Sequence, residues 1–363
     1  MTTDHGLPPM PVPAPRRDEG GRTPRPPYNE VVAAAVALMP PNPLTPEQIV
    51  PNRSIRFITA DLLTQMFDVT RRVVPCPGYE GVEISCDVFR RPDDDKVGPG
   101  YIWIHGGGMV GGEAISGLLD TAPYLREHGG TVVSIEYRLA PEHPAPIPVE
   151  DCYAATVWAI ENAAELGFDP DRVILGGGSA GGGLAAGVML LLRDRQGPKV
   201  GGVLLHCPML DDRNNSVAVQ QFDLSSGWCG QSNEVGWTAL LGDSRGTDDV
   251  SPYDAPARAT WLGDLPPVHI AVGSCDPFRD ENVAFASGIW RDGGDCELYV
   301  APGGHHGYEA LARTSTIAET TQASRSAWVR RILVGEDMAA AAETLQQLAQ
   351  TFANAAPTAT PED

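Results

Sequence analysis

The feature that most constrains this fold is residues 173–183, whose sequence is VILGGGSAGGG. Branched apolar residues at its start predict the end of a buried strand, and residues 184–195 predict a helix. Ser179 lies between them in a Gly-x-Ser-x-Gly pattern, which is typical of a nucleophile elbow, a sharp strand-to-helix turn that exposes a serine. Small neighbours let the strand and the helix approach closely, and the amide N–H groups of the helix N-terminus stabilise a developing anion.

The same glycines also match a dinucleotide-binding fingerprint, Gly176-x-Gly178-x-x-Gly181 between a strand and a helix. That fingerprint normally opens the first βαβ unit of its domain, whereas several predicted strands precede it here. It also leaves two conspicuous histidines, His105 and His306, without a role. We therefore favour the serine elbow over dinucleotide binding.

Apolar strands alternate with helices along the chain. The predicted strands are residues 100–104, 131–135, 173–175, 202–207, 268–273 and 297–301. Helices are predicted at residues 118–128, 149–166, 184–195 and 281–290 and from about residue 316, and residues 71–90 predict a β-hairpin. Strands that are continuous apolar runs, separated by helices, predict an α/β fold with a mostly parallel central sheet and helices on both faces.

Polar side chains follow several of these strands. His105, Ser179, Asp276 and His306 each come just after a predicted strand, at the edge where open α/β sheets place their active sites. A serine hydroxyl is a poor nucleophile unless a base removes its proton and a third group orients that base. The chain order serine, acid, histidine is that of the α/β-hydrolases. We therefore predict Ser179 as nucleophile, Asp276 as orienting acid and His306 as base.

Three neighbouring residues remain alternatives for these roles. His305 is an alternative base, and Asp280 and Glu281 are alternative acids. The two acids lie deeper in the following loop or helix, which favours Asp276. The adjacent histidines belong to no helical H-E-x-x-H motif, so metal binding is not expected there.

A glycine run offers the anion-binding part of such a site. Acyl transfer needs N–H groups aimed at the position of the oxyanion, and glycines let the backbone approach closely. In the run at residues 105–108, Gly107 and Gly108 are predicted to supply two of these groups, and Ala180 is predicted to supply the one that follows the nucleophile. His105 is expected to hold its loop through hydrogen bonds and not to transfer protons.

Five motifs follow one another within residues 70–333. They are HGGG at 105–108, YRLAPE at 137–142, GSAGG at 178–182, DPFRD at 276–280 and HGY at 306–308. In this order they resemble the motifs of the hormone-sensitive-lipase-like esterases, bacterial family IV of the α/β-hydrolase superfamily. The resemblance implies an α/β-hydrolase fold with a helical cap and ester hydrolysis through an acyl-enzyme, without a cofactor. It also implies the same roles for Ser179, Asp276 and His306. The chain departs from the family at Gly178, where many members have an acidic residue, and at Met109, where they have an aromatic one.

The resemblance and the local composition predict how the chain is divided. Residues 1–27 are rich in proline and charge and are expected to be disordered. Residues 28–70 are expected to form the N-terminal part of the cap, and residues 71–335 the catalytic domain, with a cap insertion at about 208–262. Residues 336–363 are expected to form a C-terminal helical extension and tail. Their apolar stripe of Leu345, Leu348 and Phe352 is predicted to pack on the body, with a homodimer contact as the alternative.

Apolar residues of the cap and the site loops are candidates to line a substrate pocket. Those expected to bind substrate are Met109, Met209, Leu210 and Trp228, and the further candidates are Phe222, Trp237 and Trp261. Some of these residues must form the core of the cap.

Composition excludes several classes of partner. The net charge of -21 makes nucleic acid and anionic membrane surfaces poor partners. The seven cysteines include no C-x-x-C pair, which favours reduced thiols in a cytoplasmic protein over a zinc or dithiol site. The apolar run at residues 31–39 is too short to span a bilayer. Neither a metal, a cofactor nor stable membrane insertion is expected.

These observations favour a cytoplasmic serine carboxylesterase that acts on small to medium acyl esters. The same triad acting on an amide, a lactone or a biosynthetic intermediate stays open, because substrate choice belongs to the pocket. A non-catalytic ligand-binding receptor on this scaffold is a further alternative. It is disfavoured because serine, acid and histidine are all present.

Overall fold

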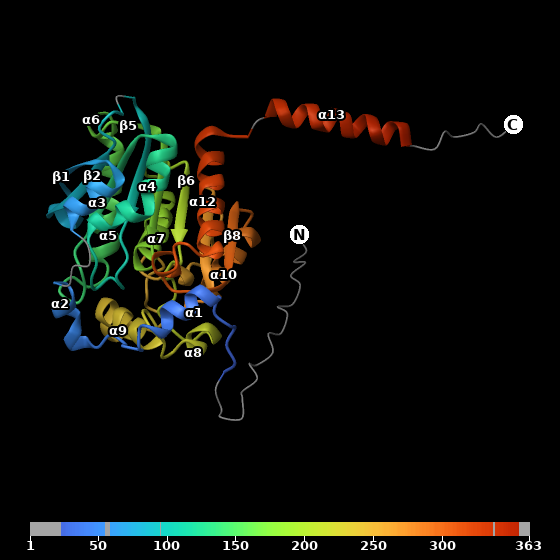
Figure 1. The fold of residues 1–363 in the computed structure, drawn as a ribbon. Helices are drawn as coiled ribbons and strands as arrows, with labels where there is room; N and C mark the ends of the chain where they lie inside the picture. The colour runs from blue at the N-terminus through green and yellow to red at the C-terminus, as the bar shows by residue number, and fades with distance from the viewer. Residues whose placement is uncertain (1–22, 55–58, 95, 337, 356–363) are drawn as a thin grey trace, which may run out of the picture.

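The computed structural model describes residues 23–54, 59–94, 96–336 and 338–355 (Figure 1). Its centre is an eight-stranded sheet in the order β1-β2-β4-β3-β5-β6-β7-β8. The strands are β1 (Thr70–Pro77), β2 (Glu83–Arg90), β3 (Gly98–Ile104), β4 (Thr131–Glu136), β5 (Phe168–Gly178), β6 (Gly202–His206), β7 (Val268–Cys275) and β8 (Cys296–His305). Only the β1–β2 and β2–β4 pairs are antiparallel. The predicted mostly parallel sheet and the hairpin at residues 71–90 are confirmed.

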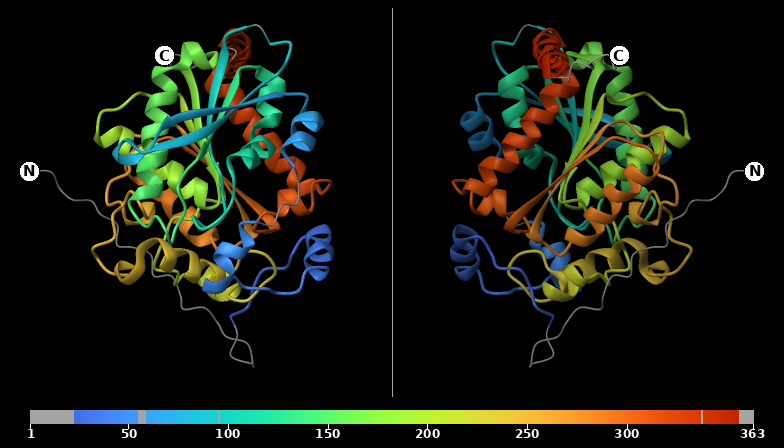
Figure 2. Two further views of the ribbon diagram at one scale, coloured as in Figure 1. Left: turned by 90° about the vertical axis from the view of Figure 1, so that its left-hand side faces the viewer. Right: turned by 90° about the vertical axis from the view of Figure 1, so that its right-hand side faces the viewer.

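Helices cover both faces of this sheet (Figures 1 and 2). One face carries α4 (Gly117–His128) and α12 (Thr316–Val334), and the other carries α5 (Ile147–Glu161), α7 (Ala180–Asp194) and α10 (Arg279–Arg291). Alternation along β3 explains the two layers, since successive strand residues point to opposite faces. Tyr101 and Trp103 join the core under α4 and α12, while Ile102 and Ile104 join the larger core under α5 and α7.

A further group of helices lies near the carboxyl ends of the parallel strands (Figure 1). They are α1 (Glu30–Ala37), α2 (Ile49–Asn52), α8 (Val217–Gln221) and α9 (Gly230–Leu241). In contrast, α3 (Ala60–Phe67) packs on α4 and contributes Leu63 to the core on that face of the sheet. The remaining helices are α6 (Ala163–Leu166), α11 (Tyr308–Leu311), α13 (Met338–Ala355) and the 3-10 turns η1 (Pro46–Gln48), η2 (Tyr79–Gly81), η3 (Ala114–Ser116), η4 (Gly242–Ser244) and η5 (Pro256–Arg258).

The C-terminal helix α13 extends away from the body (Figure 1). Leu345 and Leu348 are 60% and 50% exposed, so the predicted packing of these two residues on the body is wrong. The side chain of Phe352 lies outside the described residues. Of residues 1–27, which are expected to be disordered, residues 1–22 also lie outside them, whereas the carbonyl oxygens of Pro26 and Pro27 contact Cys275 Sγ at 3.5 and 3.3 Å. Among the helices of the described residues, none is long and apolar enough to cross a membrane.

Candidate active site

Ser179 occupies the turn between β5 and α7 with φ 57° and ψ -122°, a conformation that L-residues seldom adopt. Its neighbours have to be small for this turn to form. A Cβ atom at Gly177 would collide with the carbonyl oxygen of Gly181, and one at Gly181 would collide with the carbonyl oxygen of Ile104. The structure therefore places the serine on an elbow at the carboxyl end of a central strand, as the glycine pattern predicts.

Two hydrogen bonds join the three predicted catalytic side chains. Ser179 Oγ lies 3.0 Å from His306 Nε2, and His306 Nδ1 lies 2.8 Å from Asp276 Oδ2. Asp276 is 1% exposed, and its other oxygen accepts the Phe278 backbone N–H at 2.9 Å. The carboxylate is thus held in one orientation, with one oxygen directed at the imidazole.

The order of the strands explains how these residues meet. Asp276 follows β7 and His306 follows β8, so both lie on the same side of β5 as β6 does. Neighbouring strands are about 5 Å apart, which puts the end of β8 about 15 Å from the elbow along the sheet. The loop between β8 and α11 must therefore reach back towards β5 for His306 to contact Ser179.

The alternative residues make other contacts. The imidazole Nε2 of His305 lies 2.5 Å from the Ser226 carbonyl oxygen, and Asp280 accepts the backbone N–H of Ala218. Glu281 accepts the backbone N–H of Leu210 at 2.7 Å. All three side chains thus anchor the segment between β6 and β7, and none of them joins the hydrogen-bonded chain that starts at Ser179.

Charge around the imidazole favours its protonated form. Burial by itself lowers the pKa of His306, but the Asp276 carboxylate raises that pKa well above its usual value. An imidazolium that forms when His306 accepts a proton is therefore stabilised by the buried carboxylate. Stabilising this imidazolium is the role that the acid has in a serine–histidine–acid triad.

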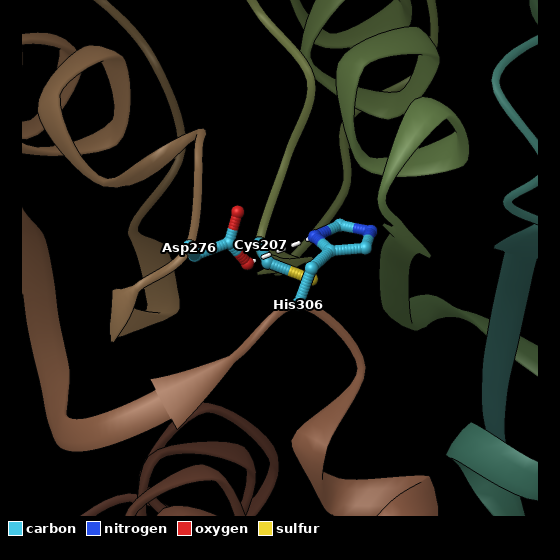
Figure 3. A group of neighbouring side chains, drawn as sticks. All are labelled: Cys207, Asp276 and His306. Carbon is cyan, nitrogen blue, oxygen red and sulfur yellow. Dashed lines mark hydrogen bonds and ion pairs between the residues drawn. The ribbon is translucent and has the colours of Figure 1, made fainter. Parts of the chain in front are cut away.

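Cys207 is a member of this cluster that the sequence prediction missed. It follows β6, and Figure 3 shows its thiol next to the Asp276–His306 pair. Donor atoms of the three side chains all lie within 4.8 Å of one another. Burial raises the pKa of the Cys207 thiol, so the thiol is neutral near pH 7. The predicted strand at residues 202–207 included Cys207, whereas β6 ends at His206 and places Cys207 directly after the strand, as it places the triad acid and base after theirs.

The predicted oxyanion loop lies against the elbow. A Cβ atom at Gly106 would be 2.9 Å from the Gly178 carbonyl oxygen and 3.2 Å from Ser179 Cβ. Gly107 and Gly108 have φ angles of 120° and 64°, which strongly favour glycine. Ala180 is the first residue of α7, where backbone N–H groups have no partner within the helix. Gly106 of this loop therefore lies against Ser179, and Gly107 and Gly108 follow directly after it.

His105 holds this loop in shape. Its Nδ1 lies 2.8 Å from the Gly106 carbonyl oxygen, and its ring stacks on Tyr137 with centroids 4.3 Å apart. The Tyr137 hydroxyl donates to the His105 carbonyl oxygen at 3.0 Å. Burial lowers the pKa of His105 to about 4, so the ring is neutral near pH 7. These contacts match the structural role expected for His105.

The structure also shows what surrounds Gly178, where the resemblance implies an acidic residue in many members of the family. A Cβ atom there would be 3.7 Å from Asp120 Oδ2 and 3.9 Å from His206 Cβ, which are ordinary contacts. Asp120 Oδ1 lies 3.6 Å from His206 Nδ1, and the backbone carbonyl of His206 accepts the Ser179 N–H at 2.8 Å. An acidic side chain from α4 thus lies beside the elbow, next to Gly178.

The predicted substrate-binding residues separate into two groups. Met109, Met209 and Leu210 are fully buried in the core shared by α5 and α7, and they line no open surface. The half-buried indole of Trp228 instead lies against Gly108, where it would collide with any Cβ atom. Trp228 is therefore the one residue of these four that reaches the oxyanion loop from the predicted cap.

The other apolar candidates are also divided. Phe222 and Trp237 are fully buried, whereas Trp261 is 51% exposed. A cavity of about 1140 Å³ opens between residues 23–25 and the region of α8 and α9, but its lining includes neither Ser179 nor His306. The hydrogen-bonded triad therefore lies outside the lining of this cavity.

Comparison with known proteins agrees with this geometry. Residues 101–310 match the family model described as the alpha/beta hydrolase fold. The carboxylic ester hydrolase LipN of Mycobacterium tuberculosis is 37% identical over 256 residues, which are 66% of this chain and 64% of LipN. The match thus spans somewhat less than two thirds of that relative. Carboxylesterase NlhH of the same organism is 34% identical over 65% of this chain and 74% of its own length.

Solved structures show the same similarity over most of the chain. A bacterial heroin esterase superposes with a TM-score of 0.76 and 36% sequence identity, covering 84% of this chain and 98% of its own. Esterase LipW from Mycobacterium marinum has a TM-score of 0.75 and 28% identity, covering 85% and 99% of the two chains. The family model covers more than half of the sequence. This protein therefore belongs to the α/β-hydrolase fold family, and its five ordered motifs place it with the hormone-sensitive-lipase-like esterases of that family.

Proposed function

We propose that this protein is a serine carboxylesterase that hydrolyses small to medium acyl esters through an acyl-enzyme intermediate. The observation that carries the proposal is the chain of hydrogen bonds from Ser179 through His306 to the buried Asp276. Similar proteins are named as ester hydrolases, which supports the same chemistry here. No cofactor is required for it.

In the proposed reaction, Ser179 Oγ attacks the ester carbonyl carbon while His306 Nε2 takes the hydroxyl proton. Asp276 keeps the Nδ1–H of His306 directed towards itself, so that Nε2 is the free acceptor. The backbone N–H groups of Gly107, Gly108 and Ala180 donate to the oxyanion of the tetrahedral intermediate.

Collapse of this intermediate breaks the ester C–O bond, and His306 returns its proton to the leaving alcohol. Water then attacks the acyl-enzyme, again with His306 as base, and the second collapse releases the carboxylic acid and restores the Ser179 hydroxyl. Every proton removed in one half of the cycle is returned in the same half.

The domain assignment belongs to the same proposal. Of the predicted cap, residues 28–54 and about 208–262 form a helical cap on a catalytic domain of residues 71–335, followed by the C-terminal extension. Within the predicted range 28–70, α3 packs instead on α4 of the catalytic domain. Support comes from α1, α2, α8 and α9, which gather near the carboxyl ends of the strands (Figure 1). In this arrangement Trp228 forms a wall of the substrate site beside Gly108. The net charge of -21 and the free cysteines support a cytoplasmic enzyme without nucleic-acid partners.

A variant of the nucleophile tests the function. We expect Ser179→Ala to lower kcat for p-nitrophenyl esters by about 10⁴-fold or more with an unchanged fold, because the group that forms the acyl-enzyme is lost. The matched control is Ser287→Ala on the exposed side of α10, which should keep full activity. Undiminished ester turnover by Ser179→Ala would reject the assignment.

Substrate class is tested with the unaltered enzyme. An acyl-chain-length series of esters, run beside amides and lactones, should show highest kcat/KM for short to medium esters. A fluorophosphonate should label Ser179 covalently, because its activated hydroxyl attacks phosphorus. Absence of labelling and of turnover would favour a receptor, and preference for amides or lactones would redirect the substrate assignment.

A further inference from the structure

Cys207 brings a sulfur donor to the acid and base of the triad. It follows β6 directly, as Asp276 follows β7 and His306 follows β8, so three adjacent strands deliver three different donor types to one place. Figure 3 shows the three side chains converging, and their donor atoms lie within 4.8 Å of one another. The mechanism proposed above uses the imidazole and the carboxylate but assigns no step to the thiol.

The donor set selects a class of cation. Thiolate sulfur, imidazole nitrogen and carboxylate oxygen are the ligands of zinc and of softer ions such as cadmium, whereas magnesium and calcium prefer oxygen alone. Bonds from zinc of about 2.0 to 2.3 Å in a tetrahedron put neighbouring ligand atoms about 3.3 to 3.7 Å apart. Donors already within 4.8 Å of one another therefore need only small side-chain movements to share one ion.

We propose that Cys207, His306 and Asp276 form a binding site for a thiophilic divalent cation, and that the bound cation inhibits the enzyme. The activity part of this inference rests on the proposed esterase function. The binding part rests on the three side chains alone.

Inhibition follows from the imidazole having two nitrogens that are both in use. During turnover one nitrogen accepts the Ser179 proton and the other donates to Asp276. A cation bonded to Nε2 occupies the electron pair that accepts the Ser179 proton, and a cation bonded to Nδ1 replaces the N–H that donates to Asp276. In both cases the positive charge of the cation opposes protonation of the ring. Binding forms metal–sulfur, metal–nitrogen and metal–oxygen bonds and releases the thiol proton to solvent, and no atom changes its oxidation state.

A second thiol cluster has to be separated from this one. Cys76 of β1 and Cys86 of β2 are both buried, and their sulfur atoms lie 3.1 Å apart. Soft cations bind such pairs as well, so cadmium uptake alone does not identify the site. The variant Cys76→Ser removes that pair and leaves the triad cluster intact, which makes it the matched control.

The test compares cation sensitivity among variants. Hydrolysis of a p-nitrophenyl ester is titrated with zinc chloride in the wild-type enzyme and in Cys207→Ala, Cys207→Ser and Cys76→Ser, with magnesium chloride in parallel. We expect zinc, but not magnesium, to inhibit the wild type and Cys76→Ser, with recovery on adding EDTA. With each variant compared with its own activity in the absence of zinc, both Cys207 variants should need more than about tenfold more zinc for half-inhibition, because a ligand has been removed. Equal zinc sensitivity in all four proteins, or an insensitive wild type, would overturn the proposal.

Direct binding is measured on the inactive Ser179→Ala variant, so that it does not depend on esterase activity. Cadmium bound to a thiolate gives an ultraviolet charge-transfer band, and this band is followed with and without Cys207→Ala in a Cys76→Ser background. We expect the band to disappear when Cys207 is removed. A band that persists there contradicts the site even if the enzyme is an active esterase. If the band depends on Cys207 but the wild-type protein hydrolyses no ester, the cation site is retained and only the proposed function is rejected.

Discussion

Two glycines of the elbow have the same side chain but very different surroundings. Gly181 lies where a Cβ atom would strike the backbone oxygens of Ile104 and His105, whereas Gly178 has only ordinary contacts with Asp120 and His206. The glycine pattern therefore contains one residue required by close backbone approach and one that is not. Sequence alone treats the two alike, because the neighbours come from β3, α4 and β6.

Alanine substitutions at these two positions should differ sharply. In an unobstructed helix interior, Gly→Ala gains about 1 kcal/mol of helix propensity, but the collision at Gly181 costs about 1–3 kcal/mol or more and displaces the elbow. We expect Gly181→Ala to lower both the free energy of unfolding and kcat/KM, and Gly178→Ala to change stability by about 0.5 kcal/mol or less. Urea denaturation and ester kinetics measure both, and equal behaviour of the two variants would contradict the steric argument.

At the scale of elements, one buried ion pair joins three segments around the sheet. Asp151 of α5 accepts two hydrogen bonds from the Arg138 guanidinium, at 2.9 and 2.7 Å, and one from the Tyr79 backbone N–H at 2.7 Å. The Arg138 segment follows β4 and leads to α5, while Tyr79 lies in the β1–β2 turn. The YRLAPE motif is thus tied to the hairpin by a side chain outside the motif.

We expect Asp151→Ala to lower the free energy of unfolding by about 3–5 kcal/mol, because it leaves the Arg138 guanidinium without its buried partner. The matched control is Glu142→Ala. Glu142 also pairs with an arginine, Arg53 at 2.8 Å, but its side chain is 47% exposed, and such pairs contribute at most about 1 kcal/mol. Urea denaturation measures the free energy of unfolding of the two variants. If both variants lose the same free energy of unfolding, burial is not what determines the contribution of these ion pairs.

Near the site, local sequence patterns predict the strands but not their exact ends or pairing. The strand predicted at residues 297–301 continues to His305, with an irregularity in its pairing to β7 between Gly273 and Cys275. Such a local shift changes where the next residues lie, and apolar periodicity contains no signal for it. For the C-terminal helix, the apolar stripe was visible in the sequence, but whether it packs is decided by neighbours that a one-dimensional pattern cannot supply.

At the scale of the whole molecule, stability depends on the acid groups that folding buries. Asp254 is 6% exposed, and burial, assisted by the charge of Glu150, raises its pKa from 3.8 to about 7. A carboxyl group whose pKa is higher in the folded state favours folding when protonated. Its unfavourable contribution is absent below pH 3.8, grows as the pH rises towards 7 and is complete above that.

Asp254→Asn should remove this dependence. We expect the variant to be more stable than the wild type at about pH 8, by a few kcal/mol at most, and the difference to shrink as the pH falls from about 7 towards 3.8. Urea denaturation over this pH range measures the effect, with the exposed Asp249→Asn as control. A stability difference that does not change with pH would show that Asp254 does not titrate as its burial requires.

Local patterns determined much of this protein: the order of strands and helices, the mostly parallel sheet, the elbow and the chemical types of the residues that follow the strands. These features can be predicted from the sequence because strand periodicity, helix periodicity and glycine clusters each involve residues that are close together in the chain. Only the tertiary structure decided which of two histidines meets Ser179, which of three acids meets that histidine, that Asp120 lies beside Gly178, and that Cys207 joins the cluster. Each of these depends on contacts between segments far apart in the chain, whose distances no local pattern contains.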